Sequence, residues 1–448
     1  YMHSELNELL GCAEILAAVL FLLLANIRSY CSDINYRPSF HGAEKLGNMM
    51  MLAAMCKTEQ FPVEDSWFCR RSSLEGEAGL APNEDEPPPW INYYYGSHLQ
   101  WATLARLSGQ PPEIAFNLAL ATLFSWIGLG AYGLALNLAK RRRVAVAAAL
   151  FLVFAGNLEP LEQLPRLLKR YEAYRGYGEN ASAGPLRPFD WEEFTSAAPF
   201  DLWRASRVIL RDASSGDGRT VNEFPYFSFI LGDLHAHCSA LALNLLLLHV
   251  LLAIWLRKEE SALTWAECAL RAPHAPLLLC LLAGGLYWYN GWEPLPLAIL
   301  LAAMFLCDRN DWTIRPVFAP LSAAAFGALI FGMGLFGFFY LYLREFEPPI
   351  QAADGAPSWK AALLIVKPRP WALASSVREL FVFWGIVWLP LILAILRRVW
   401  RLARDFGMNR YLGLAAAAAL FGAAVLALES GGLAAPICLA LAAGAGAL

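Results

Sequence analysis

The segment IAFNLALATLFSWIGLGAYGLALNLAKRRR, residues 114–143, is a long apolar stretch that ends in four consecutive basic residues. Its apolar part, residues 114–139, exceeds the ~20 residues that a helix needs to cross the hydrocarbon core of a bilayer. The same pattern recurs along the chain and predicts about ten spans. The other nine expected spans are residues 9–27, 144–158, 240–256, 276–289, 295–306, 317–341, 380–396, 411–428 and 433–448.

Basic residues cluster in the short connectors on one side of these spans, at residues 140–143, 257–258, 308–315 and 397–404. The positive-inside rule makes that side cytoplasmic. The outer side then receives the long segments, which are residues 29–113, 159–224, 287–293 and 344–370. Every polar motif that could carry out chemistry therefore falls on the outer side.

The composition indicates the same class of protein. The chain is 58% hydrophobic and only 16% charged, and its mean hydropathy is +0.42. These values exclude an ordinary soluble domain and favour an all-α polytopic membrane protein. A net charge of −3 gives no indication of a nucleic-acid partner, and the nine cysteines form no CxxC metal pattern.

The expected organisation is a single transmembrane domain over residues 1–448. It carries a first large outer-loop subdomain at residues 29–113 and a second outer loop at residues 159–224. The first span has no basic n-region and no A-x-A site, which predicts a retained helix rather than a signal peptide. The chain opens on Tyr1 and stops in an apolar run at Leu448, which favours a fragment of a longer protein.

The first outer loop contains several recognisable elements. Residues 44–55 predict an amphipathic or interfacial helix, residues 61–67 a turn, and the acidic, proline-rich residues 72–89 a mobile excursion. Tyr93, Tyr94 and Tyr95 then lead into a helix at residues 100–107. One interpretation places these tyrosines in the interfacial aromatic belt. The other makes them phosphate or sugar contacts in a polar cluster completed by Asn92 and His98.

The second loop ends in Asp233, His235 and His237, at the outer mouth of the next span. On a helix Asp233 and His237 share a face, whereas in an extended turn the two histidines share a side. Ionisable groups at this depth are costly and often functional. A site for Mg²⁺ or Mn²⁺ is one interpretation, and histidines that bond backbone at a helix start are the other.

Four further polar residues are candidates on the outer side. Arg204 and Arg207 could converge on one anion if their segment is helical, or form a solvated face. Asn290 and Glu293, in the turn between two short apolar segments, could reach a central cavity. The commoner explanation of that turn is an aromatic anchor at the interface.

The order of these motifs resembles that of the YYY-domain membrane proteins (Chlor_Arch_YYY), prokaryotic polytopic proteins grouped with the GT-C glycosyltransferases. The resemblance runs from about Glu14 to Trp292, and weakly through Trp384. The motifs that carry it are Glu44-Lys45, Phe61-Pro62 with Asp65 and Trp67, Ile91-Asn92-Tyr93-Tyr94-Tyr95 with His98, Asn117, Ala155-Gly156-Asn157-Leu158, Asn222 and Glu223 in residues 222–229, and residues 231–237.

This chain departs from the family pattern at three places. The family has an aspartate where Asn48 stands, Phe-Gly-His where Gly96-Ser97-His98 stands, and an aspartate at the position of Glu293. The Asn48 difference puts any essential second carboxylate there in doubt.

The resemblance implies a GT-C-like fold and a transferase in a prokaryotic cell membrane that takes a polyprenyl-phosphate-linked sugar at the outer face. The acceptor would be a glycan, a lipid or a protein. In such chemistry a carboxylate removes a proton from the acceptor hydroxyl, while hydrogen-bond donors and cations stabilise the departing phosphate. Glu44 is the expected base, with Asp65 second. The expected substrate contacts are Tyr93, Tyr94, Tyr95, His98, Arg204, Arg207, Asn222, Glu223, Asn290 and Glu293.

Two other functions remain open at this point. A transporter would place ionisable groups near the bilayer midplane and show repeated halves. In this chain only Glu14, Asn244 and His249 stand out as polar residues within spans. A non-catalytic lipid-binding or scaffold protein is favoured if the outer carboxylates do not converge.

Overall fold

A computed structural model describes residues 2–30, 32, 44–59, 61–65, 90–161, 163, 205, 206, 208, 222–261, 265–307, 318–339, 382–387, 390, 393, 394 and 397. The chain divides into two compact units. The first unit comprises Tyr1–Phe154 and Ser228–Leu364, and the second comprises Ala155–Phe227 and Ile365–Leu448. Each unit is described by itself below.

Among the described residues, three helices are long and apolar enough to cross a membrane. They are α1 (Met2–Tyr30), α5 (Pro112–Ala139) and α11 (Ala236–Ser261). A helix satisfies all its backbone hydrogen bonds within itself, which is what a segment without access to water requires. These three helices confirm the expectation of an integral membrane protein, whereas the total of ten spans stays a prediction.

The other apolar helices of the described chain are shorter. They are α6 (Arg142–Phe154), α13 (His274–Tyr289), α14 (Pro294–Cys307) and α16 (Phe318–Phe331), which continues as the π-helix η2 (Gly332–Phe338). They lie at four of the expected spans. α6, α13 and α14 each have fewer than the ~20 residues of a full crossing, and α16 reaches that length only together with η2. The expected spans at residues 411–428 and 433–448 lie outside the described residues.

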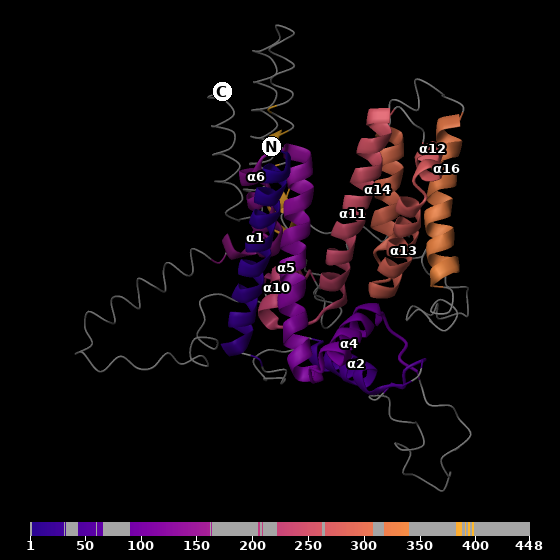
Figure 1. The fold of residues 1–448 in the computed structure, drawn as a ribbon. Helices are drawn as coiled ribbons and strands as arrows, with labels where there is room; N and C mark the ends of the chain where they lie inside the picture. Colours follow the sequence, from indigo (N-terminus) through magenta and orange to yellow (C-terminus); the bar gives the residue numbers. More distant parts are fainter. Residues whose placement is uncertain are drawn as a thin grey trace, which may run out of the picture. The chain divides into compact units, whose positions relative to one another are not determined.

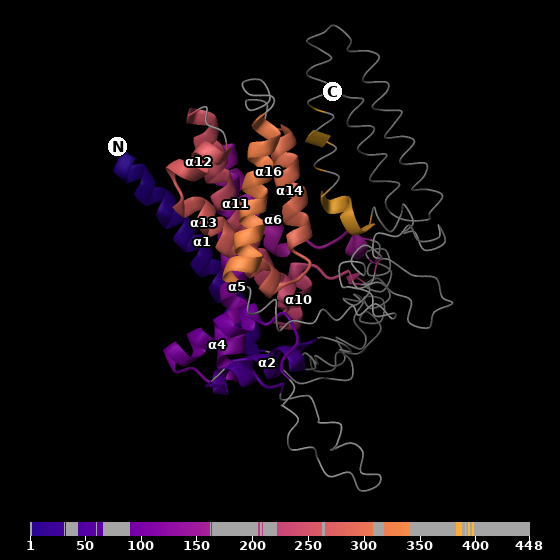
Figure 2. The ribbon, with the colours of Figure 1, turned by 90° about the vertical axis from the view of Figure 1, so that its right-hand side faces the viewer.

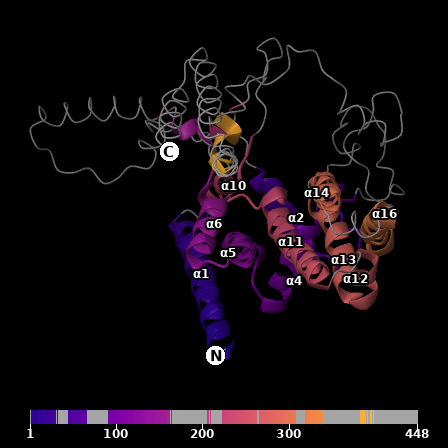
Figure 3. The ribbon, with the colours of Figure 1, turned by 90° about the horizontal axis from the view of Figure 1, so that it is seen from above.

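In the first unit, α5 is the central helix of one group and α13 of another. α5 packs against α1, α6 and α11, and α13 packs against α11, α16 and η2 (Figure 1 and, from above, Figure 3). Gly128 of α5 lies against the side chain of Leu20 of α1, and a methyl group at that position would overlap it. Small residues of this kind let membrane helices approach closely.

An aromatic cluster fills the second group of helices. Trp265, at the start of α12 (Trp265–Arg271), is fully buried and contacts Phe305 and Phe326 at ring-centroid distances of 5.1 and 5.3 Å. The ammonium of Lys258 lies 5.8 Å from the centroid of the Trp265 ring. A cation over an indole face is attracted by the ring quadrupole, so this buried lysine is held beside an aromatic surface.

Two short helices lie across the end of the first unit at which α5 begins. They are α2 (Lys45–Lys57) and α4 (Gly96–Ser108), and they pack against each other and against α5 (Figures 1 and 2). α2 confirms the helix expected at residues 44–55, and α4 contains the helix expected at residues 100–107. The expected turn is present as far as Asp65, and Glu64 forms a bridge with Trp90. The excursion expected at residues 72–89 lies outside the described residues.

The described part of the second unit is held by buried polar groups. The Asn157 amide donates to the carbonyl of Ala205, and the Gln163 amide donates to the buried carboxylate of Glu159. The backbone N–H of Leu158 donates to the carbonyl of Val382 at 2.8 Å. The first and the last of these bonds join chain segments that are distant in sequence within that unit.

The basic connectors provide a direct test of orientation. α5 and α11 both run away from the end that carries α4 and finish in basic residues, at positions 140–143 and at Arg257 and Lys258. A cysteine introduced by Glu59→Cys lies beside the exposed end of α2, and one introduced by Arg141→Cys lies in the basic connector. Native Cys268 is buried, so introduced cysteines in a cysteine-free background are the better probes.

We expect an impermeant thiol reagent to label Glu59→Cys in intact cells and Arg141→Cys only after permeabilisation. Labelling yield by mass shift is the measurement, and Arg141→Cys leaves three of the four basic residues in place. The reverse pattern of labelling would overturn the assignment of α2 and α4 to the outer side.

Candidate functional site

The site is organised around a turn that precedes α11. α10 (Pro225–Leu231) ends at Gly232, whose φ of 70° lies in the left-handed region. The backbone N–H of Asp233 donates to the carbonyl of Ser228 at 2.9 Å and closes the helix end. Glycine is favoured at such a position because it has no Cβ to clash. The Leu-Gly-Asp sequence therefore ends α10 and turns Asp233 away from it.

Asp233 joins this turn to α2 of the same unit. Its Oδ1 accepts a hydrogen bond from the Asn48 amide at 2.8 Å, and its Oδ2 accepts one from the backbone N–H of Glu44 at 3.1 Å. Asn48 and Asp233 are both buried. Burial raises the pKa of the Asp233 carboxyl, and the hydrogen bonds from Asn48 and from the Glu44 backbone act in the opposite direction.

A buried arginine lies beneath the same turn. A side chain at Gly232 would overlap the guanidinium of Arg28, at the end of α1. The Nε of Arg28 donates to the side-chain oxygen of Asn117, on α5, at 2.8 Å. Gly232 is thus required both by its backbone conformation and by the close approach of the arginine. Arg28 therefore ties the end of α1 to the first part of α5.

Glu44 lies at the start of α2, and its carboxylate is 53% exposed. Its Oε2 accepts a hydrogen bond from the Tyr93 hydroxyl at 3.3 Å and lies 3.7 Å from Nε2 of His235. Burial, together with the Glu44 charge, raises the pKa of the Tyr93 hydroxyl, so this hydroxyl remains a hydrogen-bond donor at neutral pH. The backbone of Glu44 is therefore fixed by Asp233 while its side chain remains accessible.

A cavity of about 430 Å³ opens beside this carboxylate. Its wall contains Glu44, Asp65, Asn92 and Tyr93, with apolar residues of α2 on the other side. This volume falls within the range of small-molecule sites. The structure therefore brings together the two carboxylates that the sequence suggested as general bases, although they are 21 positions apart in sequence.

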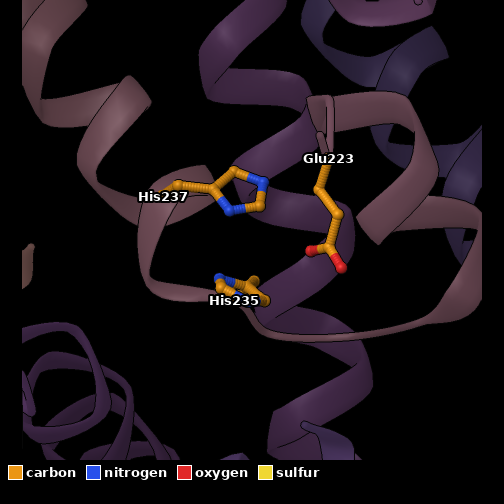
Figure 4. A group of neighbouring side chains, drawn as sticks. All are labelled: Glu223, His235 and His237. Carbon is orange, nitrogen blue, oxygen red and sulfur yellow. The ribbon is translucent and has the colours of Figure 1, made fainter. Parts of the chain in front are cut away.

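The two histidines of the turn lie side by side (Figure 4). The turn from Asp233 to His235 is not helical, and the ring centroids of His235 and His237 are 4.4 Å apart. This is the extended alternative considered from the sequence. Nε2 of His237 lies 3.2 Å from the Ser228 hydroxyl, so Ser228 and the neighbouring ring hold the imidazole of His237. The Asp233 carboxylate instead accepts its hydrogen bonds from residues of α2 and from Glu44 before it.

His98, on α4, has no exposed surface. Its two ring nitrogens have no hydrogen-bond partner within the part of the chain that the structure describes. Burial, with repulsion from His235, lowers the pKa of His98 to about 3. His98 is consequently neutral at physiological pH and contributes an uncharged ring beneath the site.

The three tyrosines face different surroundings. Tyr93 reaches Glu44, whereas the Tyr94 ring lies against Gly291, where a Cβ would overlap it. The Tyr95 ring meets the edge of Trp288 with ring centroids 5.6 Å apart. The structure thus assigns only the first tyrosine to the cavity, and the other two pack against the turn at the end of α13.

That turn carries a second polar cluster. The carboxylate of Glu293 accepts hydrogen bonds from the Asn244 amide at 2.6 Å and from the Asn290 amide at 3.0 Å. Tyr289 donates from its hydroxyl to the side chain of Gln100 and so ties the turn to α4. These contacts form one network of Glu293, Asn290 and Asn244. The sequence did not indicate that Asn244 belongs with the other two.

The remaining sequence candidates are Arg204, Arg207, Asn222 and Glu223. Arg204 and Arg207 are outside the described residues. Asn222 and Glu223 belong to the second unit, where Asn222 is buried and its backbone N–H donates to the carbonyl of Ser206 at 2.9 Å.

Two contributions to the site could not be assigned from the sequence. Asn48 was noted only as a departure from a pattern, and Arg28 was not singled out. A buried arginine directly after an apolar stretch is the signal that could have singled out Arg28, because an ionised side chain at that depth needs partners.

The pairing of Asn48 with Asp233 leads to a pH-dependent prediction. Asn48→Asp places a second carboxyl 2.8 Å from a buried one, and two carboxylates at that distance cannot both ionise readily. The folded pKa of the pair is then raised above the unfolded value of about 3.9, so stability is lost as the pH rises above that value. We expect a loss of about 3 kcal/mol at pH 8, of which about half is recovered at pH 5.

Thermal unfolding in detergent at the two pH values measures this effect. Asn48→Ala is the matched control, because it removes the amide without adding a charge and should cost about 1–3 kcal/mol with a much weaker pH dependence. Equal stability of Asn48→Asp and the parent at pH 8 would contradict the geometry.

Comparison with known proteins agrees with a membrane protein. A sequence profile described as "Uncharacterized membrane protein (DUF2298)" matches residues 5–448. No curated protein and no solved structure matches the chain. The profile covers almost the whole sequence, including the three membrane-length stretches found among the described residues. The chain therefore belongs to the DUF2298 family of membrane proteins.

Proposed function

We propose that this protein is a membrane glycosyltransferase that uses a polyprenyl-phosphate-linked sugar at the outer membrane face. The observation that carries the proposal is the cavity of about 430 Å³ in which Glu44, Asp65, Asn92 and Tyr93 meet. Carboxylates, an amide and a phenol hydroxyl are suitable for binding and deprotonating a hydroxyl group. The resemblance to YYY-domain proteins and to GT-C enzymes supports the same reaction class.

Glu44 is the general base in this proposal. Its carboxylate takes the proton of an acceptor hydroxyl, whose oxygen attacks the anomeric carbon of the sugar. The bond between that carbon and the phosphate oxygen breaks, and the polyprenyl phosphate leaves with the electron pair. Asp233 acts as a positioning residue, because it holds the backbone of Glu44 at 3.1 Å without entering the cavity.

The substrate contacts follow from the same arrangement. Tyr93 and Asn92 bind the sugar or the acceptor within the cavity, and Tyr94 and Tyr95 fix the turn that carries Asn290 and Glu293. Arg204 and Arg207 bind the lipid phosphate in this proposal, since guanidinium groups match phosphate geometry. His98 supports the site from beneath as a neutral buried ring.

The side chains of Asp233, His235 and His237 were the expected ligands of a metal ion. Mg²⁺ and Mn²⁺ prefer oxygen ligands, whereas the turn offers two imidazoles, and both oxygens of Asp233 already accept hydrogen bonds from α2. These residues fit Mg²⁺ or Mn²⁺ poorly, and no step of the proposed reaction runs through a metal.

The rival functions have less support. A non-catalytic scaffold was the expectation if the outer carboxylates did not converge, and Glu44 and Asp65 line one cavity. For a transporter, His249 is the polar residue deepest in α11, but its Nε2 donates to the Gly130 carbonyl at 2.9 Å and joins two helices. In the described part of the chain, His249 therefore packs two helices together.

The central test is the pair Glu44→Gln and Asp65→Asn. Glu44→Gln keeps the shape and removes the basicity, so we expect turnover to fall by about 10²–10⁴ while binding of the lipid donor is retained. The measurement is sugar transfer from a polyprenyl-phosphate donor by the purified protein in lipid, alongside donor binding. Asp65→Asn is the matched control from the same cavity. Normal turnover of Glu44→Gln with loss in Asp65→Asn would assign the base to Asp65.

Chelation tests the role of the histidines. We expect sugar transfer to continue in excess EDTA, because the turn lacks the oxygen ligands of a Mg²⁺ site. His237→Ala should instead lower the unfolding temperature through loss of its contact with Ser228, without a specific kinetic effect. Activity that vanishes on chelation and returns with Mg²⁺ or Mn²⁺ would establish the metal site at Asp233, His235 and His237.

A further inference from the structure

A second, larger cavity lies within the membrane-spanning part of the first unit. It has a volume of about 640 Å³, and most of its wall comes from α5 and α11. Leucine side chains and Trp126 supply most of the wall, and α4 and α13 contribute Gln100 and Tyr289. We refer to this cavity as the α5–α11 groove. It is separate from the reaction cavity beside Glu44, with which it shares no lining residue.

The groove spans at least half of a bilayer. Along α11 its wall extends from Ser239, in the first turn, to His249, and along α5 it extends from Leu123 to Leu136. These ten and thirteen residues of helix rise about 15 and 20 Å, compared with the ~30 Å hydrocarbon core. Because α11 begins at the end of the unit that carries α4, the groove runs from near that end into the membrane-spanning part.

Lipid chains surround this part of the molecule. Leu246 lines the groove and is 48% exposed, so the groove is open on one side. Both helices that form its walls are long and apolar enough to span a membrane. A mostly apolar groove that opens toward the hydrocarbon of a bilayer is suited to a hydrocarbon chain.

Polar groups in the groove point to a particular lipid rather than to bulk lipid. The Ser239 hydroxyl is buried in the first turn of α11 and has no hydrogen-bond partner among the described residues. Buried hydroxyls normally have a partner. Gln100, at the same end, is held by the Tyr289 hydroxyl. An oxygen-bearing head group at the top of the chain would provide the acceptor that Ser239 lacks.

A polar contact joins the two main walls of the groove. His249 donates to the Gly130 carbonyl, and its ring lies so close to Gly133 that a Cβ there would overlap it. Small residues and polar contacts of this kind let membrane helices pack closely. His249 therefore links α11 to α5 at the groove.

One residue of the groove is close in sequence to the proposed reaction site. Gln100 belongs to α4, which begins at Gly96, three residues after Tyr93 of the reaction cavity. We propose that the α5–α11 groove binds the hydrocarbon chain of the polyprenyl phosphate, with its phosphate ester beside Ser239 and Gln100. The identity of this lipid rests on the proposed function, whereas the groove and its orphaned hydroxyl do not.

Photo-crosslinking tests the proposal without requiring turnover. The full chain is reconstituted in phosphatidylcholine nanodiscs with polyprenyl phosphate that carries a diazirine on its chain. A phosphatidic acid with a diazirine in one acyl chain is the comparison probe. We expect the polyprenyl probe to label peptides of α5 and α11, and unlabelled polyprenyl phosphate, but not phosphatidic acid, to compete for that labelling.

Two tryptophan variants of α11 form a matched pair. Leu246→Trp fills the groove and should lower labelling and affinity about tenfold. Leu256→Trp changes a residue of the same type, 40% exposed on the same helix but not part of the groove wall, and should have no effect. Ala242→Leu narrows the groove more gently and keeps the test valid if Leu246→Trp fails to fold.

Each outcome bears on one proposal. Equal labelling by both probes, or equal labelling of Leu246→Trp and Leu256→Trp, would show ordinary boundary lipid and overturn the groove assignment. Specific labelling by a protein that transfers no sugar from any polyprenyl donor would keep the groove and refute the glycosyltransferase. Sugar transfer with no labelling of α5 and α11 would refute the groove assignment and keep the glycosyltransferase.

Discussion

The carboxylate of Asp233 is the contact on which the candidate site depends. It is buried, and it binds the Asn48 side chain and the Glu44 backbone at the start of α2, almost 190 positions away in sequence. An ionisable group at this depth is costly unless its oxygens are satisfied. Its two hydrogen bonds offset that cost, and they fix the position of α2 relative to the first turn of α11. Without them the Glu44 carboxylate would have no defined place beside Tyr93 and His235.

The membrane imposes a second constraint, because helices in lipid cannot rely on the hydrophobic effect to hold them together. The first unit uses close approaches and polar contacts instead. The Leu20 side chain packs closely against Gly128, and the His249 ring packs closely against Gly133. Arg28 joins α1 to α5 through its hydrogen bond to Asn117. The α5–α11 groove persists between these fixed contacts. The same devices that hold the spans together therefore also shape the cavity between two of them.

Local features of this fold could be predicted from the sequence. The apolar runs within α1, α5 and α11 are long enough to identify by length and hydropathy alone. The helical pattern at residues 44–55 predicted α2. The long-range contacts could not be predicted. Nothing local pairs Asn48 with Asp233, or Asn244 with Glu293, because such pairs depend on how the spans pack. The turn at Asp233 was limited to two geometries, and the choice between them required the position of Gly232 and the end of α10.

Burial divides the two central carboxylates between two roles. Asp233 is buried, each of its oxygens accepts a hydrogen bond from the start of α2, and it does not line the cavity; burial raises the pKa of its carboxyl. Glu44 is anchored through its backbone, which leaves its side chain exposed to the cavity and to solvent. A general base must reach the proton it removes and release it again. Only Glu44 meets that requirement, and it does so because Asp233 takes the structural role beside it.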